Sequence, residues 1–244
     1  MAGAHQARPR LLLIGAVEST AVALAAMCDA GVPPVAVITL PHERRAAHSD
    51  YVDLEPLCLE RDIPVLREAN VNDARVLTKV EDLKPDYMLV IGWSRLVKAE
   101  FRAIAPGGVI GYHPTLLPAM RGRAALGWTI ALGLRETGST LFWIDEGVDT
   151  GPIALQRRFP LPDNLYLDQL LALHMVALQS MITELVHGLV NGSCPRIEQD
   201  HSRASYLALR RAEDGEIDWR DTAAAIERLV RAVSRPYPGA FTYY

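Results

Sequence analysis

A doubly wound α/β fold with a mostly parallel, Rossmann-like sheet is predicted by two features of the 244-residue sequence. Short, almost entirely apolar segments, such as residues 10–16, 35–40 and 87–91, alternate with longer segments of helical apolar periodicity. Strands without a polar face are typical of parallel sheets that helices cover on both sides. In addition, 50% of the residues are hydrophobic, which at this length is enough to bury a sizeable core.

The individual elements follow from local patterns in chain order. Gly31 is a stop signal for the first helix, and residues 41–50 read as a polar loop. The leucines and methionines of the longest helix indicate a core stripe rather than a binding face. We expect strands at 10–16, 35–40, 64–66, 87–91 and 109–111, a pair at 137–144 and 153–160, and helices at 18–30, 51–62, 72–83, 165–190 and 221–234.

Two regions are expected along the chain. Residues 1–192 form the predicted catalytic domain. Residues 193–244 form a linker and a small C-terminal subdomain with a helix and a β extension. From the abrupt aromatic end of this subdomain we expect either a trimmed chain or a short terminal strand that pairs elsewhere.

Composition argues against several classes of protein. A net charge of −4 gives no electrostatic reason to expect binding to nucleic acid. The longest apolar runs are far shorter than the about 20 residues of a membrane-spanning helix. The three cysteines are too widely spaced for a disulfide framework or a zinc site, and their odd number suits a reducing compartment. We therefore expect a cytoplasmic protein that binds neither nucleic acid nor membrane.

Two common nucleotide and hydrolase motifs are missing from the sequence. The turn after the first strand, residues 15–20, lacks the glycine spacing of a dinucleotide-binding loop, and Glu18 would repel a phosphate there. No G-x-S-x-G elbow is present for a serine nucleophile. A nicotinamide cofactor and an α/β-hydrolase mechanism are both disfavoured.

The segment 111–151 contains the residues with the clearest chemical character. His113 lies at the expected end of a strand, and Asp149 lies in a turn with glycines on both sides. A histidine and a carboxylate suit proton handling near pH 7. A lone histidine is more often a hydrogen-bonded core residue, but the prolines and glycines nearby fix loop shapes that a packed core does not require. Because loops after parallel strands meet at one edge of a sheet, we expect the turns at 15–20 and 92–95 to share that edge with the His113 loop.

Other charged residues of this segment have competing interpretations. Asp145, Glu146 and Asp149 could suggest calcium, but their spacing does not match an EF-hand loop, and we expect no metal. Arg121 and Arg123 form a tight basic turn, which is either an ordinary surface turn or a site for an anionic substrate or cofactor.

Four ordered motifs in this segment resemble the 10-formyltetrahydrofolate-dependent formyltransferases, which include methionyl-tRNA formyltransferase and the sugar N-formyltransferases. They are HPTLLP, RGR, ETGST and DEGVDTG. A weaker resemblance extends over residues 10–156, and EDGEIDW and RPYPGAFT resemble the linker and C-terminal region of the sugar-modifying and tRNA-modifying members. One position departs from the family pattern. Gly111 replaces an asparagine that is taken to hold the formyl oxygen.

The resemblance implies roles for particular residues. His113 and Asp149 would be catalytic, and Thr115 would brace the loop in place of the family serine. Loss of an oxyanion donor at Gly111 can cost about two to three powers of ten in rate, unless another group takes its place. The formyl donor would be 10-formyltetrahydrofolate, held by Trp93, Ser94, Arg95, Leu96, Val97, Ile144, Asp145, Glu146, Gly147 and Val148. Residues on the acceptor side would be Ser49, Asp50, Tyr51, Arg121 and Arg123.

Several classes of amine are candidates for the acceptor. A nucleotide-linked amino sugar is the first expectation, because the Gly-Trp-Ser turn at residues 92–94 and the short polar linker resemble the amino-sugar branch of the family. The alternatives are an amino-acid or aminoacyl amine of the hydroxyornithine, peptide-synthetase or tRNA type, and a catalytically silent folate-binding domain of a larger protein. Pairing through a C-terminal strand or helix predicts a homodimer.

Overall fold

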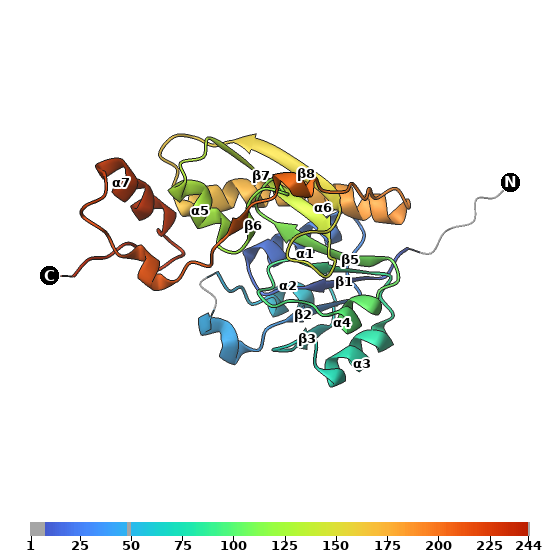
Figure 1. Cartoon of the computed structure of the whole chain (residues 1–244). Helices are drawn as coiled ribbons and strands as arrows, with labels where there is room; N and C mark the ends of the chain where they lie inside the picture. Colours follow the sequence, from blue (N-terminus) through green and yellow to red (C-terminus); the bar gives the residue numbers. More distant parts are fainter. Residues whose placement is uncertain (1–7, 48–49, 244) are drawn as a thin grey trace. The chain divides into compact units, whose positions relative to one another are not determined.

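The computed structural model describes residues 8–47 and 50–243 (Figure 1). The chain divides into two compact units, Met1–Gly111 with Ile182–Pro195, and Tyr112–Met181 with Arg196–Tyr244. Strand β5 (Gly108–His113) and helix α6 (Leu167–Val190) each contribute residues to both units. The expected division at residue 192 therefore differs from the compact units, and it stays a prediction.

The first unit is built on a parallel sheet. Its strands are β1 (Leu11–Ile14), β2 (Ala36–Thr39), β3 (Val65–Arg67), β4 (Tyr87–Val90) and the start of β5. Leu13 pairs with Val37 of β2 and with Leu89 of β4, and Val90 pairs with Gly111 of β5. All four residues of β1 are buried, which agrees with an apolar strand covered on both faces.

The sheet as a whole has seven strands in the order β3-β2-β1-β4-β5-β7-β8. Strands β7 (Glu136–Trp143) and β8 (Ile153–Pro160) pair antiparallel, whereas the pairs from β3 to β5 are parallel. The prediction of a mostly parallel α/β sheet is confirmed. The helices of the first unit are α1 (Glu18–Asp29), α2 (Glu55–Leu59), α3 (Ala74–Leu83), α4 (Ala99–Ala103) and the end of α6.

The second unit joins the hairpin of β7 and β8 to helices and a short ribbon. Its further elements are β6 (Arg121–Gly122), α5 (Ala125–Ala131), the start of α6, β9 (Tyr206–Leu207) and α7 (Ala223–Ala232). Strand β6 pairs with β9 in a two-stranded parallel ribbon. A buried cluster of Ile130, Leu165, Leu167, Leu170 and Ala232 joins α5, α6 and α7.

Helix α6 is long and apolar enough, by length and composition, to cross a membrane, and it is the only such helix in the described residues. Leu170, Leu178 and Met181 are fully buried along it. A core helix of a compact domain has the same composition, and the predicted leucine and methionine stripe is buried here.

The turns after β1 and β4 lie against each other, as the sequence predicts. The hydroxyl of Thr20 donates to the carbonyl oxygen of Ile91 at 2.6 Å. The backbone N–H of Ala16 donates to the carbonyl oxygen of Gly92 at 3.3 Å. A Cβ at Gly15 would lie 1.9 Å from the Ile91 oxygen. Glycine is therefore required where these two backbones meet.

Some local predictions are wrong. The helix expected at 51–62 is reduced to α2, because Tyr51 forms a β-bridge with Val17 and a proline lies in the first helical turn. The expected loop at 41–50 contains a 3₁₀ helix, His42–Ala47, while residues 48 and 49 lie outside the described residues. Helix α4 and strands β6 and β9 are too short to produce a periodic pattern in the sequence.

Candidate active site

His113 is the last residue of β5 and is 5% exposed. Because side chains alternate along a strand, position 111 and His113 face the same side of β5. The imidazole Nε2 lies 2.7 Å from the carbonyl oxygen of Met120, and a carbonyl only accepts, so Nε2 carries a proton. The other ring nitrogen, Nδ1, lies 3.6 Å from Oδ2 of Asp149. A second proton on Nδ1 therefore makes the ring a cation that pairs with this carboxylate.

Asp149 lies in the connection between β7 and β8. Its φ of 54° is a left-handed conformation, which is uncommon for residues other than glycine. Its Oδ2 accepts a hydrogen bond from the backbone N–H of Gly122 at 2.8 Å. Asp145 closes the same turn, since its Oδ1 accepts from the N–H of Gly147 at 3.0 Å and from the hydroxyl of Thr150 at 2.6 Å. The structure thus brings the aspartate and the histidine together in an ordered loop.

The loop after the histidine is held from two strands. The hydroxyl of Thr115 donates to the carbonyl oxygen of Ala119 at 3.0 Å, which is the bracing expected of this residue. From β7, the hydroxyl of Thr140 donates to the carbonyl oxygen of Thr115 at 2.7 Å. From β8, the amide of Gln156 donates to the carbonyl oxygen of Leu117 at 2.9 Å. These bonds fix the path of the chain that ends at the carbonyl of residue 120.

Arg121 is placed inside the protein, with 1% of its surface exposed. Its Nη2 donates to Oε1 of Gln199 at 2.7 Å and to Nδ1 of His201 at 3.0 Å, and its Nη1 donates to the hydroxyl of Tyr206 at 3.0 Å. These three bonds go to the protein itself, while Nε of Arg121 is buried and has no hydrogen-bond partner among the described residues. The expected role of Arg121 in binding substrate stays a prediction. Arg123, the other arginine of the turn, is exposed.

Gln199 is a site residue that the sequence did not reveal. It is 5% exposed, and its Nε2 donates to the carbonyl oxygens of Asp149 at 3.0 Å and Gly151 at 2.6 Å. The residue lies in an irregular polar stretch between α6 and β9. No motif or apolar period marks this stretch, so only the three-dimensional contact identifies it.

The expected folate-side residues 93–97 follow β4 in the first unit. Asn72 shapes this loop, because its Nδ2 donates to the carbonyl oxygen of Leu96 at 2.9 Å and its Oδ1 accepts from the N–H of Lys98 at 2.8 Å. The indole Nε1 of Trp93 is buried and has no hydrogen-bond partner among the described residues. Such an unsatisfied donor is costly, and a ligand acceptor would relieve it.

The other expected folate-side residues, 144–148, belong to the second unit. Glu146 and Val148 are exposed there. The expected meeting of the two folate-side segments stays a prediction.

On the expected acceptor side, Ser49 lies outside the described residues, and Asp50 and Tyr51 belong to the first unit. The hydroxyl of Tyr51 is buried, as is that of Thr39 on β2. The roles of these residues in binding an acceptor stay predictions.

A cluster of possible metal ligands is formed by residues on either side of Asp50 and Tyr51 in the sequence. One ligand atom each from His42, Asp53 and Glu55 falls within 4.8 Å of the others. However, Nη2 of Arg67 lies 2.9 Å from the Asp53 carboxylate and 2.5 Å from that of Glu55. Burial alone would raise the pKa of Asp53, but its hydrogen bonds, led by the one from Arg67, outweigh this and lower the pKa. The guanidinium already neutralises the two carboxylates that a cation would need.

A second histidine, His174 on α6, is completely buried in a polar cluster. Its Nδ1 lies 2.8 Å from the hydroxyl oxygen of Ser139 and 3.4 Å from that of Tyr112, which is next to His113 on β5. Burial, helped by the nearby charge of His113, lowers the pKa of His174 to about 3. His174 is therefore neutral at physiological pH and is not a proton donor for the site.

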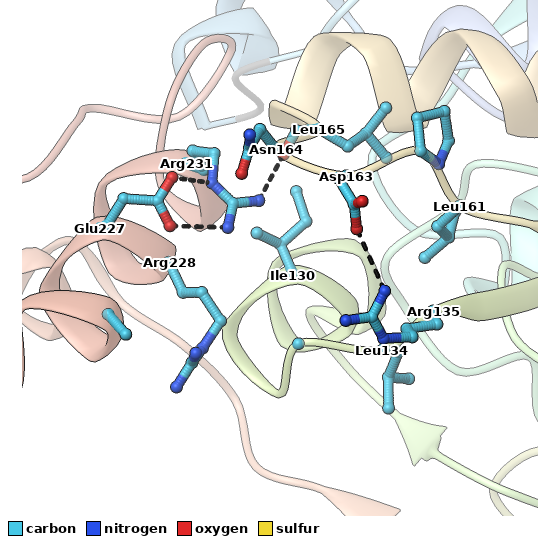
Figure 2. Close-up of a pocket in the computed structure, with 13 residues that line it drawn as sticks. Ile130, Leu134, Arg135, Leu161, Asp163, Asn164, Leu165, Glu227, Arg228 and Arg231 are labelled. Carbon is cyan, nitrogen blue, oxygen red and sulfur yellow. Dashed lines mark hydrogen bonds and ion pairs between the residues drawn. The ribbon is translucent and has the colours of Figure 1, made fainter.

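A separate cavity of about 260 Å³ lies in the second unit, between the end of α5, the loop before α6, and α7 (Figure 2). Its charged residues largely satisfy one another. Arg135 pairs with Asp163 at 3.2 Å, Arg231 pairs with Glu227 at 2.5 Å, and Arg228 donates to a backbone carbonyl. None of the predicted site residues lines this cavity. Arg231 also joins α7 to the residues before α6, because its Nη1 donates to the carbonyl oxygen of Leu165 at 3.0 Å.

Comparison with known protein families identifies both parts of the chain. Residues 29–173 match the formyl transferase family model, and residues 210–244 match the model of the formyl transferase C-terminal domain. His113 and Asp149 lie within the first match, whereas Gln199 lies between the two.

Solved structures share the fold at low sequence identity. The sugar 3N-formyltransferase WlaRD, solved in the presence of dTDP and 5-N-formyl-THF, matches with a TM-score of 0.74 and 17% identity, over 96% of this chain and 83% of that one. An N-formyltransferase from Helicobacter canadensis, in complex with folinic acid and dTDP-3-aminofucose, matches with a TM-score of 0.72 and 19% identity. The match covers 92% of this chain and 80% of that one. HypX from Aquifex aeolicus, in complex with tetrahydrofolic acid, matches with a TM-score of 0.69 and 19% identity. The match covers 97% of this chain and 36% of HypX.

The likeness to these structures establishes the fold, while the family model covers more than half of the sequence and includes the buried His113 and the half-buried Asp149. The chain therefore belongs to the formyl transferase family of enzymes.

Proposed function

We propose that the protein transfers a formyl group from 10-formyltetrahydrofolate to a primary amine, and that the acceptor is a nucleotide-linked amino sugar. The observation that carries the proposal is the pairing of His113 with Asp149 at 3.6 Å, inside the segment that matches the formyl transferase family. A cationic imidazole beside a carboxylate suits a reaction that creates an oxyanion and moves a proton.

The reaction follows a balanced course. The unprotonated amine attacks the formyl carbon, a C–N bond forms, and the carbonyl oxygen becomes an oxyanion. The bond from the formyl carbon to the folate nitrogen then breaks, while a proton passes from the amine to that nitrogen. Asp149 accepts and relays this proton through water, and it stabilises the cationic form of His113, which in turn stabilises the oxyanion.

The replacement at Gly111 places more of the work on the histidine. In the described structure both ring nitrogens are engaged, Nε2 by the carbonyl of Met120 and Nδ1 by Asp149. To donate to the oxyanion, Nε2 must exchange the Met120 carbonyl for the formyl oxygen. The longer contact, from Nδ1 to Asp149 at 3.6 Å, is of the kind that often tightens when substrate binds.

We propose that the folate is held by Trp93 and by residues 94–97 and 144–148. The indole N–H of Trp93, which is buried and finds no acceptor among the described residues, supports a polar ligand at that position. The turn set by Asp145 presents backbone groups in a fixed shape, which suits recognition of the pterin edge. Ser49, Asp50, Tyr51 and Arg123 are proposed for the acceptor side.

The amino-sugar acceptor is supported by two of the structural neighbours, whose names describe sugar formyltransferases or a dTDP-amino-sugar complex. An assay with 10-formyltetrahydrofolate and a panel of dTDP- and UDP-linked amino sugars, following release of tetrahydrofolate, tests this directly. Release that depends on one amino sugar identifies the acceptor. Release only with hydroxyornithine or an aminoacyl amine would replace the sugar by that class.

The catalytic pair can be tested by substitution. His113→Asn and Asp149→Asn should each lower kcat by about 10²- to 10⁴-fold, because each removes a proton-transferring or charge-stabilising group. The matched control is His187→Asn, which changes an exposed histidine of α6. Near-normal turnover in either active-site variant would remove that residue from the mechanism.

A catalytically silent folate-binding module is the second candidate. The observation in its favour is Gly111, since the loss of an oxyanion donor is a direct route to inactivity. The match to HypX, of which the chain spans 36%, also fits a unit of a larger protein. Binding of 5-formyltetrahydrofolate in a titration, with no turnover of any amine in the panel, would favour this function.

A further inference from the structure

We propose that Gln199 is a positioning residue for Asp149, and that Arg121 fixes the orientation of the Gln199 amide. The inference rests on the proposed role of Asp149 in proton transfer. Gln199 lies between the two segments matched by the family models, residues 29–173 and 210–244. It is a feature of this chain outside those matched segments.

The chemistry of Arg121 determines which way the Gln199 amide faces. A guanidinium has donors and no acceptor, so the group at 2.7 Å from its Nη2 must be the Gln199 carbonyl oxygen, Oε1. The NH₂ group of Gln199 then faces the opposite way. There it donates to the carbonyl oxygens of Asp149 and Gly151. A reversed amide would place an oxygen against two carbonyls and an NH₂ group against a cation.

Asp149 benefits from this support because its backbone is left-handed, at a φ of 54°. Such a conformation costs free energy in a residue with a side chain, and it persists only where the surroundings enforce it. Gln199 binds the carbonyl of Asp149 and the carbonyl two residues later, so it spans the peptide that follows the aspartate. This fixes the direction in which the carboxylate leaves the backbone.

Strand β6 closes the arrangement into a ring. The side chain of Arg121 holds the Asp149 backbone through Gln199, while the N–H of the next residue, Gly122, holds the Asp149 carboxylate directly at 2.8 Å. The strand itself is fixed by the bond from the Arg121 N–H to the carbonyl oxygen of Ser205 at 2.8 Å. Two adjacent residues, Arg121 and Gly122, thus fix both the backbone carbonyl and the side-chain carboxylate of Asp149.

Arg121 is suited to this role by its burial. It is 1% exposed, and its described hydrogen-bond partners Gln199, His201 and Tyr206 present neutral acceptors. A hydrogen bond from a charged donor to a neutral acceptor is stronger than one between two neutral groups. The bond to Oε1 therefore holds the amide more firmly than a neutral donor would.

The decisive variant is Gln199→Glu. It keeps the size of the side chain and its bond to Arg121, but replaces the donor to Asp149 and Gly151 by an oxygen that repels both carbonyls. We expect kcat to fall about 10- to 100-fold while KM for donor and acceptor changes less than about threefold, because misplacing a reacting group mainly affects the chemical step. The exposed neighbour Glu198→Gln is the matched control and should retain wild-type kcat.

A spectroscopic readout separates positioning from general damage. The ¹⁵N signals of the His113 ring report its tautomer and its contact with Asp149, so they should shift in folded Gln199→Glu and stay unchanged in Glu198→Gln. If Gln199→Glu does not fold, Gln199→Met keeps the bulk without a buried charge and is tested in the same way. A folded Gln199 variant with wild-type kcat and unchanged ring signals overturns the proposal.

The failure of the proposed function is distinguishable from the failure of this inference. If the wild-type protein transfers no formyl group to any amine, the proposed function fails. The ¹⁵N signals of the His113 ring then decide on their own whether Gln199 positions Asp149. A shift in the Gln199 variants then supports positioning of Asp149, and an unchanged spectrum rejects it.

Discussion

Two buried histidines in this protein show how the surroundings of a side chain select its chemistry. His113 lies beside the carboxylate of Asp149 and next to the backbone carbonyl of Met120, at the end of a strand. His174 lies among hydroxyl groups, with Phe159 edge-on at 5.0 Å between ring centres, and its pKa is lowered to about 3. The same residue type is a candidate catalyst in one place and a neutral core group in the other.

The lowered pKa of His174 predicts a specific loss of stability in acid. Its pKa of about 3 in the folded chain lies below the ordinary 6.5, so the unfolded chain binds the proton first as pH falls. The contribution is fully present above about pH 6.5 and is lost toward pH 3, at about 1.4 kcal/mol per pH unit. Urea unfolding between pH 7 and 4.5 should therefore show a weaker pH dependence for His174→Asn than for the wild type.

The exposed His187→Asn on the same helix provides the control and should keep the wild-type slope. Equal slopes for the wild type and His174→Asn would show that the buried ring does not drive the acid sensitivity.

At this scale, sequence reasoning found residues with recognisable chemistry in a recognisable setting. His113 and Asp149 were identified by their glycine- and proline-rich loops, and they do meet. Gln199 could not be identified, because an amide in a polar stretch has no signature until the chain folds back onto the aspartate loop. Arg121 was noticed for its charge, but its burial depends on contacts with residues about 80 positions later.

Among the elements, the helices with long apolar stripes were the most predictable. Helix α6 was expected at 165–190 and spans Leu167–Val190, and strand β8 matches its expected range. The helix expected at 51–62 failed, because a single proline and one β-bridge outweigh a short amphipathic pattern. Strands β6 and β9 have two residues each, so their pairing could not be inferred from either segment alone.

The stripe of α6 leads to a stability prediction. Leu170 is fully buried and packs in the cluster with Ile130 and Ala232, so Leu170→Ala should lower the free energy of unfolding by about 2–5 kcal/mol. Val176→Ala on the same helix is the control, because Val176 is 70% exposed and should change stability by less than about 0.5 kcal/mol. Equal midpoints in chemical denaturation would contradict the assignment of this face to the core.

For the whole molecule, the two compact units are interleaved along the sequence rather than consecutive. The cause within the second unit is visible in its long-range bonds. Ile197 forms a β-bridge with Ile153, and Tyr206 of β9 pairs with Arg121 of β6. The segment after α6 is therefore part of the candidate active site, although the sequence suggested a linker.

This arrangement predicts the effect of shortening the chain. A protein ending at Gly192 lacks Gln199 and the partners of Arg121, so it should show no formyl transfer, and amide hydrogens at residues 147–151 should exchange faster. A protein ending at Leu209 retains those contacts and should protect the same amides better. The measurement is hydrogen exchange by mass spectrometry on both proteins. Equal exchange in the two would show that residues 193–209 do not support the aspartate loop.

The ring that joins Asp149, Gln199, Arg121 and Gly122 also bears on enzyme engineering. The stretch from His113 to Asp149 contains both reactive groups, which suggests that it could be moved as one segment into another protein. Its geometry, however, depends on an amide 50 positions downstream of the aspartate. A graft that copies the motif without a substitute for that amide would carry the reactive groups but leave one of them unanchored.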